Sequence, residues 1–187
     1  MKIGVDEVGR GCLFGPVVSA AVALVGDHSH LGLTDSKKLS AKKREAIFEN
    51  LFDGDHLIGI GQASPVEIDE INILQASLLS MKRAVFSLDL SLKENVSIFV
   101  DGTFKIPGID PKVKQTALIK GELKEPSIAA ASIVAKVFRD RLVAAMEESY
   151  PGYGIKDHKG YPTKSHKTAL SKLGPTDQHR RTFKGVL

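Results

Sequence analysis

The chain has 187 residues, of which 42% are hydrophobic and 26% charged, and its formal net charge is +4 at pH 7. This length suits one globular domain of residues 1–187, and the longest apolar stretch, 17–25, is too short to cross a bilayer. The single cysteine, Cys12, excludes an internal disulfide. Acidic residues 6 and 7 stand where a signal peptide would be apolar, so a cytoplasmic protein without membrane association is expected.

Short apolar segments alternate with amphipathic ones in the first half of the chain. Strands are predicted over residues 2–6, 17–25 and 57–63 from their apolar runs. Ser40 is expected to cap a basic helix that ends near Asp53 and Gly54. Ser64 and Glu67 have the spacing of a capping box. One helix or a pair of helices is therefore predicted to follow, with apolar residues at helical spacing at Ile71, Leu74, Leu78, Met81 and Val85.

The second half predicts two more strands, over residues 96–100 and 113–119, and a long amphipathic helix over 126–148. The residues of that helix expected to face the core are Ile128, Ile133, Val137, Phe138, Leu142 and Met146. Thr163 is expected to cap a last helix that stops at Gly174, after a mobile connection over 152–160. Interleaved strands and helices predict an α/β layered domain, with a C-terminal helical segment from about 150 to 187.

Carboxylates close two of the predicted strands. Asp6 and Glu7 close the first strand and Asp101 the fourth, while Asp140 lies on the long helix, where the flanking Phe138 and Leu142 favour a buried side. Four converging acids would repel one another and raise each other's pKa. Hard divalent cations such as Mg²⁺ remove that conflict, and two of them can clamp a phosphodiester during its displacement. The alternative is that these acids are surface caps or salt-bridge partners.

A glycine-rich loop follows the first strand. Neighbouring strand residues face opposite sides, so Glu7 is expected where the strand gives way to Val8-Gly9-Arg10-Gly11. Glycines expose backbone groups to a ligand, and Arg10 can bind a phosphate in bidentate fashion. An ordinary turn is the alternative interpretation.

Basic residues gather in two stretches, and a polyanionic partner suits them. Lys37 and Lys38 belong to the first, residues 34–44. The second, 156–184, contains Tyr161, which can stack on a base or sugar or else pack beneath the last helix. His158, His166 and His179 match no metal-binding spacing, so solvent-facing or phosphate-contacting roles are expected. Cys12 is expected to pack as a small hydrophobic residue.

Taken together, the motifs resemble the ribonuclease HII family. The similar blocks keep the family's order and span nearly the whole chain: residues 4–11, 14–17, 35–40, 68–74, 100–102, 131–136, 139–141, 158–163 and 179–183. Two departures are Thr103, where the family usually has Asn after Asp-Gly, and Thr182, where Ser is commoner.

The resemblance implies a ribonuclease H-like fold with a five-stranded mixed sheet flanked by helices. It implies that a monomer hydrolyses RNA in RNA–DNA hybrids and cuts on the 5′ side of ribonucleotides embedded in duplex DNA, leaving 3′-OH and 5′-phosphate ends. It also implies Mg²⁺ or Mn²⁺ held by four acids, Asp6, Glu7, Asp101 and Asp140. Asp6 and Asp101 are expected to lie nearest both ions.

The resemblance further implies that Gly9, Arg10 and Gly11 read the 2′-OH at the RNA–DNA junction. It also implies that Tyr161 stacks on the deoxyribose there. A 2′-OH is the local difference between RNA and DNA, so the pair of contacts makes chemical sense. Lys136 lies one turn before Asp140 and is expected to hold either that carboxylate or a phosphate.

Three alternatives remain open. The related ribonuclease HIII family carries Gly-Lys-Gly and an added N-terminal substrate-binding domain, for which Asp6 lies too near Met1. A non-catalytic duplex-binding module is a second alternative, which the four acids argue against. Other two-metal nucleases of this fold, such as junction resolvases, lack the Gly-Arg-Gly and Gly-Tyr blocks.

Overall fold

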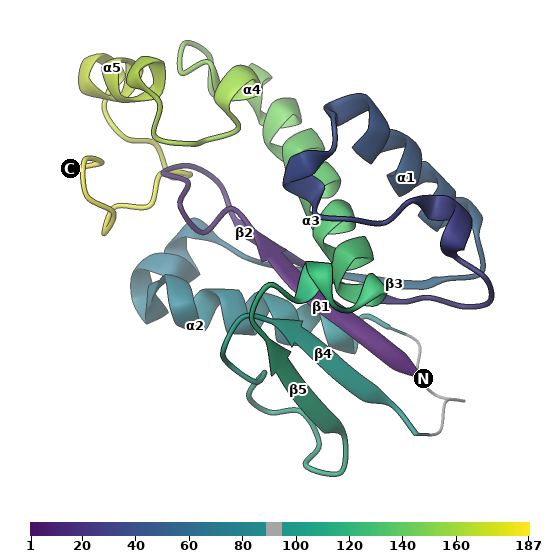
Figure 1. The fold of residues 1–187 in the computed structure, drawn as a ribbon. Helices are drawn as coiled ribbons and strands as arrows, with labels where there is room; N and C mark the ends of the chain where they lie inside the picture. The colour runs from purple at the N-terminus through teal and green to yellow at the C-terminus, as the bar shows by residue number, and fades with distance from the viewer. Residues whose placement is uncertain (89–94) are drawn as a thin grey trace.

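A five-stranded mixed sheet forms the centre of the molecule (Figure 1). In this computed structural model, which describes residues 1–88 and 95–187, the strand order is β3-β2-β1-β4-β5. β2 is antiparallel to both β1 and β3, whereas β4 is parallel to both β1 and β5. The strands are β1 (Lys2–Val8), β2 (Val17–Ala23), β3 (Leu57–Ala63), β4 (Ser97–Asp101) and β5 (Lys114–Leu118). The predicted five-stranded mixed sheet is confirmed.

Helices cover both faces of the sheet (Figure 1). α1 (Ala41–Asp53) and α3 (Pro126–Ala145) pack on one face against Ala20 and Val22 of β2. α2 (Pro65–Phe86) packs on the other face against Ala21 and Ala23. Successive β2 residues thus serve two separate cores, as the alternation of a strand requires. Short 3₁₀ helices occupy Ser29–Leu31, Ser36–Lys38, Gly121–Leu123 and Met146–Glu148.

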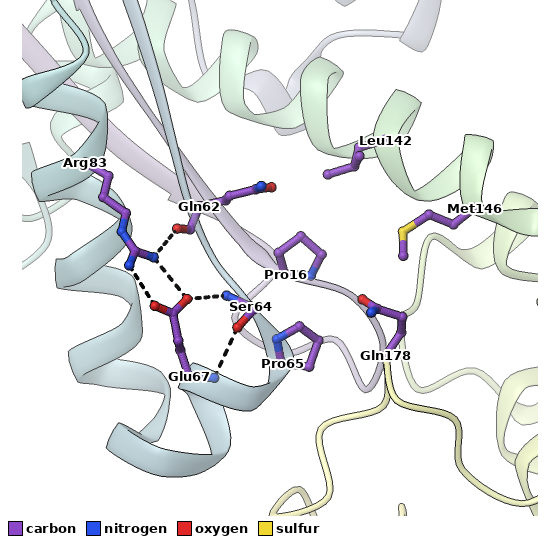
Figure 2. A pocket seen from close by; sticks show the side chains of 9 residues that line it. All are labelled: Pro16, Gln62, Ser64, Pro65, Glu67, Arg83, Leu142, Met146 and Gln178. Carbon is purple, nitrogen blue, oxygen red and sulfur yellow. Dashed lines mark hydrogen bonds and ion pairs between the residues drawn. The ribbon is translucent and has the colours of Figure 1, made fainter. Parts of the chain in front are cut away.

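The start of α2 carries the predicted capping box (Figure 2). The Ser64 hydroxyl accepts a hydrogen bond from the Glu67 N–H at 3.2 Å, and the Glu67 carboxylate accepts one from the Ser64 N–H at 2.9 Å. A kink at Asn72, with φ 66° and ψ 163°, divides α2 into two helices. The kink turns Ile71 out of the apolar stripe in which it was expected, and its side chain is 38% exposed.

The connection over residues 152–160 differs from the prediction. It contains a short helix, α4 (Ile155–His158), and buries both Tyr153 and Ile155. The Tyr153 hydroxyl donates a hydrogen bond to the Gly174 carbonyl at 2.6 Å, which fixes the connection against the end of α5 (Lys164–Leu173). These tertiary contacts order a stretch whose glycines alone suggested mobility.

The C-terminal segment packs on the loop that follows β1 and on the end of α3 (Figure 1). Their shared apolar cluster comprises Leu13, Phe14, Val143, Tyr153, Ile155, Leu170 and Val186. A β-bridge joins Phe14 to His179. Across residues 1–88 and 95–187, no helix combines the length and the apolar character needed to cross a membrane.

Candidate active site

A cleft lies where β1 and β4 end. We call it the carboxylate cleft; it has a volume of about 180 Å³ and is lined by Asp6, Glu7, Val8, Asp35, Ser36, Lys37, Asp101, Glu122, Ser132, Lys136 and Tyr161. Three of the four predicted acids, Asp6, Glu7 and Asp101, therefore meet at one place. Lys37, Lys136 and Tyr161 from the predicted substrate contacts meet there too.

The sheet itself creates this cleft. β1 pairs with β4 only from Lys2 to Val5, whereas its pairing with β2 continues to Val8. The strand therefore stays regular through Glu7, contrary to the prediction that it gives way there. Asp6 and Glu7 both border the cleft because β4 ends beside them and leaves that edge of β1 open.

Burial sets the electrostatics of the first two acids. Asp6 is 8% exposed, and its burial raises the pKa of its carboxyl well above the ordinary value; the neighbouring Glu7 and Asp101 raise it further. Burial also raises the pKa of Glu7, although Arg10 lowers it through an ion pair of 3.3 Å. Two carboxyl groups with raised pKa in one cleft are the conflict that a cation relieves.

Asp101 and Glu122 come from neighbouring chain segments. The Asp101 Oδ1 accepts a hydrogen bond from the Gly121 N–H at 2.7 Å, and the adjoining Glu122 lines the cleft. A Cβ at Gly121 would lie 2.5 Å from Ile128 Cδ1, so a larger residue there would require the Ile128 side chain to shift. The sequence reasoning missed Glu122. The signal that could have found it is an acid shortly after the fifth strand, the pattern that identified Asp101.

Asp140, predicted as the fourth acid, does not border the carboxylate cleft of the described structure. Its carboxylate instead accepts a hydrogen bond from Lys136 Nζ at 2.9 Å, one turn away on α3. The same ammonium lies 5.5 Å from the centre of the Tyr161 ring. Lys136 was expected to hold either the Asp140 carboxylate or a phosphate, and in the structure it holds the carboxylate.

An adjoining groove of about 400 Å³ shares Glu7 and Asp101 with the carboxylate cleft. Arg10, Thr103 and Lys120 are among its lining residues. In the Gly-Arg-Gly loop, Gly9 is buried and Gly11 is exposed. Lys38 is exposed on the 3₁₀ helix Ser36–Lys38 but lines neither hollow.

The three histidines cluster beside the Tyr161 segment, and two of them are buried, not at the surface as expected. His166 and His179 are buried, with 3.2 Å between their Nε2 atoms, and His158 stacks on His166. Tyr161 itself is 37% exposed and faces the cleft, so it is not hidden beneath the last helix. Cys12 is buried as predicted.

A separate pocket of about 340 Å³ lies between the start of α2, the end of α3 and Gln178 (Figure 2). Its one carboxylate, Glu67, is bound to Arg83, which lowers the pKa of Glu67 to about 2. Glu67 also closes the capping box of α2. The charge of Glu67 is therefore already neutralised by Arg83. Among its described lining residues, the pocket offers no free carboxylate that could bind a metal ion.

The donor set of the carboxylate cleft suits hard divalent cations, because its acids offer only carboxylate oxygens. Within residues 1–88 and 95–187, no three His, Cys, Asp or Glu side chains lie close enough to hold an ion as they stand. The acids therefore fit a cation by chemistry and by location, and their side chains have to converge to bind it.

The sheet order, the flanking helices and the acid-lined cleft define a protein of the ribonuclease H-like class. The family model of ribonuclease HII matches residues 3–186. Ribonuclease HII of Desulfotalea psychrophila is 54% identical over 183 residues, which cover 98% of this chain and 80% of that protein. The chain belongs to the ribonuclease HII family.

Further relatives agree with this assignment. Ribonuclease HII of Magnetococcus marinus is 50% identical over 98% of this chain and 84% of its own length. The crystal structure of ribonuclease H2 from Pyrococcus horikoshii has 29% identity and a TM-score of 0.78, covering 99% of this chain and 94% of that chain. Bst-RNase HIII in complex with Mn²⁺ has 20% identity and a TM-score of 0.73, covering 99% and 67%, and shares the fold.

Proposed function

We propose that this enzyme hydrolyses the RNA strand of RNA–DNA hybrids and cuts duplex DNA on the 5′ side of embedded ribonucleotides, leaving 3′-OH and 5′-phosphate ends. The observation that carries the proposal is the convergence of Asp6, Glu7 and Asp101 at the open edge of β1, in a chain of the ribonuclease HII family. The buried Asp6, with its raised pKa, supports a site that works with a bound cation.

Mg²⁺ or Mn²⁺ is the proposed cofactor. The carboxylate oxygens of the cleft support it, as does the Mn²⁺ complex of the related Bst-RNase HIII. Asp6 and Asp101 would hold both ions, with Glu7 and a fourth acid completing one site each. Two such ions supply charge neutralisation and Lewis acidity for a phosphodiester displacement.

For the fourth acid we favour Glu122 over the predicted Asp140. Glu122 lines the carboxylate cleft, whereas Asp140 is engaged by Lys136 outside it. Under this proposal Asp140 keeps Lys136 beside Tyr161, and Lys136 meets the substrate backbone. Variants of the two acids separate these roles.

The remaining residues bind and orient the duplex. Arg10, Lys37 and Lys136 supply cations that can contact phosphates along the carboxylate cleft and the adjoining groove. Lys38, next to Lys37, extends this basic surface. Tyr161, which is partly exposed in the carboxylate cleft, offers its ring for stacking on a sugar, and Gly9 to Gly11 bring backbone groups to the junction.

The test is cleavage of a DNA duplex carrying one embedded ribonucleotide, with Mg²⁺ or Mn²⁺. The wild type should make one cut 5′ to the ribonucleotide, and Asp101→Asn should abolish it. Glu122→Gln should reduce the rate by at least about 100-fold, the loss typical when a charge-stabilising group is removed, and Asp140→Asn should cost much less. The reverse order would restore Asp140 as the fourth acid.

Two other outcomes would change the proposal. Cleavage confined to long RNA–DNA hybrids would retain the carboxylate cleft but contradict the roles given to Gly9, Gly11 and Tyr161. Tight duplex binding without cleavage under either metal would favour a non-catalytic binding module.

A further inference from the structure

Arg139 and Arg180 are the largest side chains that the structure buries completely, each with 0% exposure. Neither forms an ion pair with a carboxylate within residues 1–88 and 95–187. Burying an unpaired cation costs several kcal/mol unless its donors are satisfied. Hydrogen bonds inside the fold explain why the two arginines are buried there.

Both guanidinium groups bind backbone carbonyls of the loop that follows β1. We call residues 9–16 the recognition loop. Arg139 donates to the carbonyls of Phe14 at 2.9 Å and Pro16 at 3.0 Å. Arg180 donates to the Arg10 carbonyl at 3.0 Å and twice to the Gly15 carbonyl, at 3.0 and 2.9 Å. One arginine comes from α3 and the other from the C-terminal segment, so the loop is held from two sides.

Arg139 and a backbone hydrogen bond of Leu13 join the recognition loop to the segment that carries Tyr161. Arg139 also donates to the Lys159 carbonyl at 2.9 Å. The Leu13 N–H donates to the Gly160 carbonyl at 2.8 Å, and the Arg180 N–H donates to the Leu13 carbonyl at 2.9 Å. Arg139 and the Leu13–Gly160 bond therefore fix the two segments proposed to read the junction relative to one another, while Arg180 holds the recognition loop from the other side.

The bond from Arg180 sets the direction of one peptide group in particular. In a trans peptide the C=O and the following N–H point in opposite directions. Because the Arg10 carbonyl faces the buried Arg180, the Gly11 N–H faces away from it, toward the outside. Gly11 is exposed, and nothing lies within 4 Å of the position that its Cβ would take. An outward N–H with free space around it can donate to a ligand hydroxyl.

A guanidinium suits this task better than an ammonium. Its donors lie in one rigid plane and can hold several carbonyls at fixed angles, whereas a lysine offers a single flexible point of attachment. The fit is also tight, since a Cβ at Gly9 would lie 2.2 Å from Arg139 Nε. The glycine therefore admits the arginine beneath the recognition loop.

We infer that Arg139 and Arg180 are positioning residues for junction reading: they orient the recognition loop, and the Gly11 N–H within it, opposite Tyr161. This inference rests on the proposed function, because it assigns these segments to the 2′-OH and the adjoining deoxyribose. It predicts that loosening either arginine impairs discrimination of a single ribonucleotide more than it impairs cleavage of a continuous hybrid.

The experiment compares Arg139→Lys and Arg180→Lys with the wild type. Arg141→Lys is the matched control, because Arg141 lies on the same helix but is exposed and pairs with Glu45 and Glu49. Three quantities are measured for each: the unfolding temperature, the cleavage rate on single-ribonucleotide and continuous-hybrid substrates, and the amide hydrogen exchange of Leu13 and Gly15.

The two buried variants should lose at least about tenfold more rate on the single ribonucleotide than on the hybrid, since a displacement of about 1 Å can cost about 100-fold. Leu13 and Gly15, whose N–H groups are hydrogen-bonded in the wild type, should exchange faster in both variants. The control should match the wild type in every respect. Equal losses on both substrates with a lowered unfolding temperature would overturn the inference, and so would unchanged rates.

Amide exchange also covers the case in which a lysine variant does not fold. Leu13 and Gly15 should then be protected in the wild type without nucleic acid, and free exchange there would overturn the inference. If the wild type cleaves only long hybrids, the junction-reading part of the proposed function fails. The exchange data still show whether the arginines hold the loop.

Discussion

The buried carboxyl of Asp6 couples stability to activity at a single residue. Its raised pKa means that the ionised form is disfavoured in the folded protein without metal. Asp6→Asn should therefore raise the metal-free unfolding temperature by roughly 2–4 °C, as expected for a gain of about 1 kcal/mol in a domain of this size. Cleavage should fall by at least about 100-fold.

Thermal unfolding in chelator and a cleavage assay check this prediction together. The exposed Asp55→Asn serves as a control and should change neither quantity. An Asp6→Asn protein that unfolds at the same temperature or lower would contradict the idea that repulsion and burial strain this site.

His166 and His179 form a chain of neutral rings. The Tyr161 carbonyl can only accept, so the His166 Nδ1 at 2.9 Å must carry a proton. The unprotonated His166 Nε2 then accepts from His179 Nε2–H, and the His179 Nδ1 accepts from the Thr176 N–H at 3.0 Å. A further proton on either ring would break a hydrogen bond beneath Tyr161.

Burial, with a smaller contribution from His166, lowers the pKa of His179 to about 4, whereas an unfolded histidine titrates near 6.5. Below about pH 6.5, His179 binds a proton in the unfolded chain but stays neutral in the folded protein. The free energy of unfolding should therefore decrease as the pH falls from about 6.5 to 4. The loss should reach on the order of 3 kcal/mol. Denaturant unfolding across this range measures it; His179→Gln should flatten the profile, and the exposed His30→Gln should not.

At the level of residues, the sequence predicted the acids that end strands. Asp6, Glu7 and Asp101, which the structure brings to one cleft, were identifiable because they lie at the ends of apolar strands. Asp140 was placed with the other acids because Phe138 and Leu142 flank it, whereas its one-turn spacing from Lys136 indicated the ion pair that the structure contains. Glu122 was missed because it lies in a 3₁₀ turn that a hydrogen bond from Gly121 to Asp101 brings to the cleft.

At the level of elements, the starts of helices that have a capping residue in the sequence were predictable. Ser40, Ser64 and Thr163 each accept a backbone hydrogen bond at the start of a helix, at the positions predicted. The extent of β1 was less predictable, because β2 keeps it paired to Val8. α4 could not be predicted, since its order depends on contacts with the distant Gly174 and the C-terminal segment.

The kink of α2 depends on one side chain. The Asn72 Oδ1 accepts hydrogen bonds from the N–H groups of Leu74 and Gln75, at 3.0 and 3.2 Å, and thereby caps the second half of the helix. Asn72→Ala should lower the free energy of unfolding by about 1–2 kcal/mol, because the cap is lost while the positive φ remains. Asn72→Asp retains the cap and should cost much less. Urea unfolding of both variants measures the difference, and equal costs would assign the kink to tertiary packing alone.

At the scale of the whole molecule, the formal net charge is +4, and one helix near the C-terminus carries several exposed lysines. The surface of α5 presents Lys164, Lys167 and Lys172 along one hollow. If these lysines contact phosphates, Lys164→Gln and Lys167→Gln should weaken duplex binding for every sequence. Each should reduce the slope of log K against log salt concentration by about 1.

Binding measured at several salt concentrations tests this prediction. Lys112→Gln and Lys114→Gln, beside and on β5, are matched controls and should leave the slope unchanged. A slope that depends equally on all four lysines would indicate general attraction by net charge without a defined track for the duplex.

The bond between Arg180 and the Arg10 carbonyl joins residues 170 positions apart in the chain. A ribosome adds roughly 5–20 residues per second, so the loop leaves the peptidyl-transferase centre roughly 10–30 s before the arginine that orients it. All the acids of the cleft are synthesised before that arginine. The acids proposed for catalysis are thus synthesised well before the arginine proposed to orient the recognition loop. A nascent chain should therefore be unable to recognise a junction until Arg180 has been added and has folded into place.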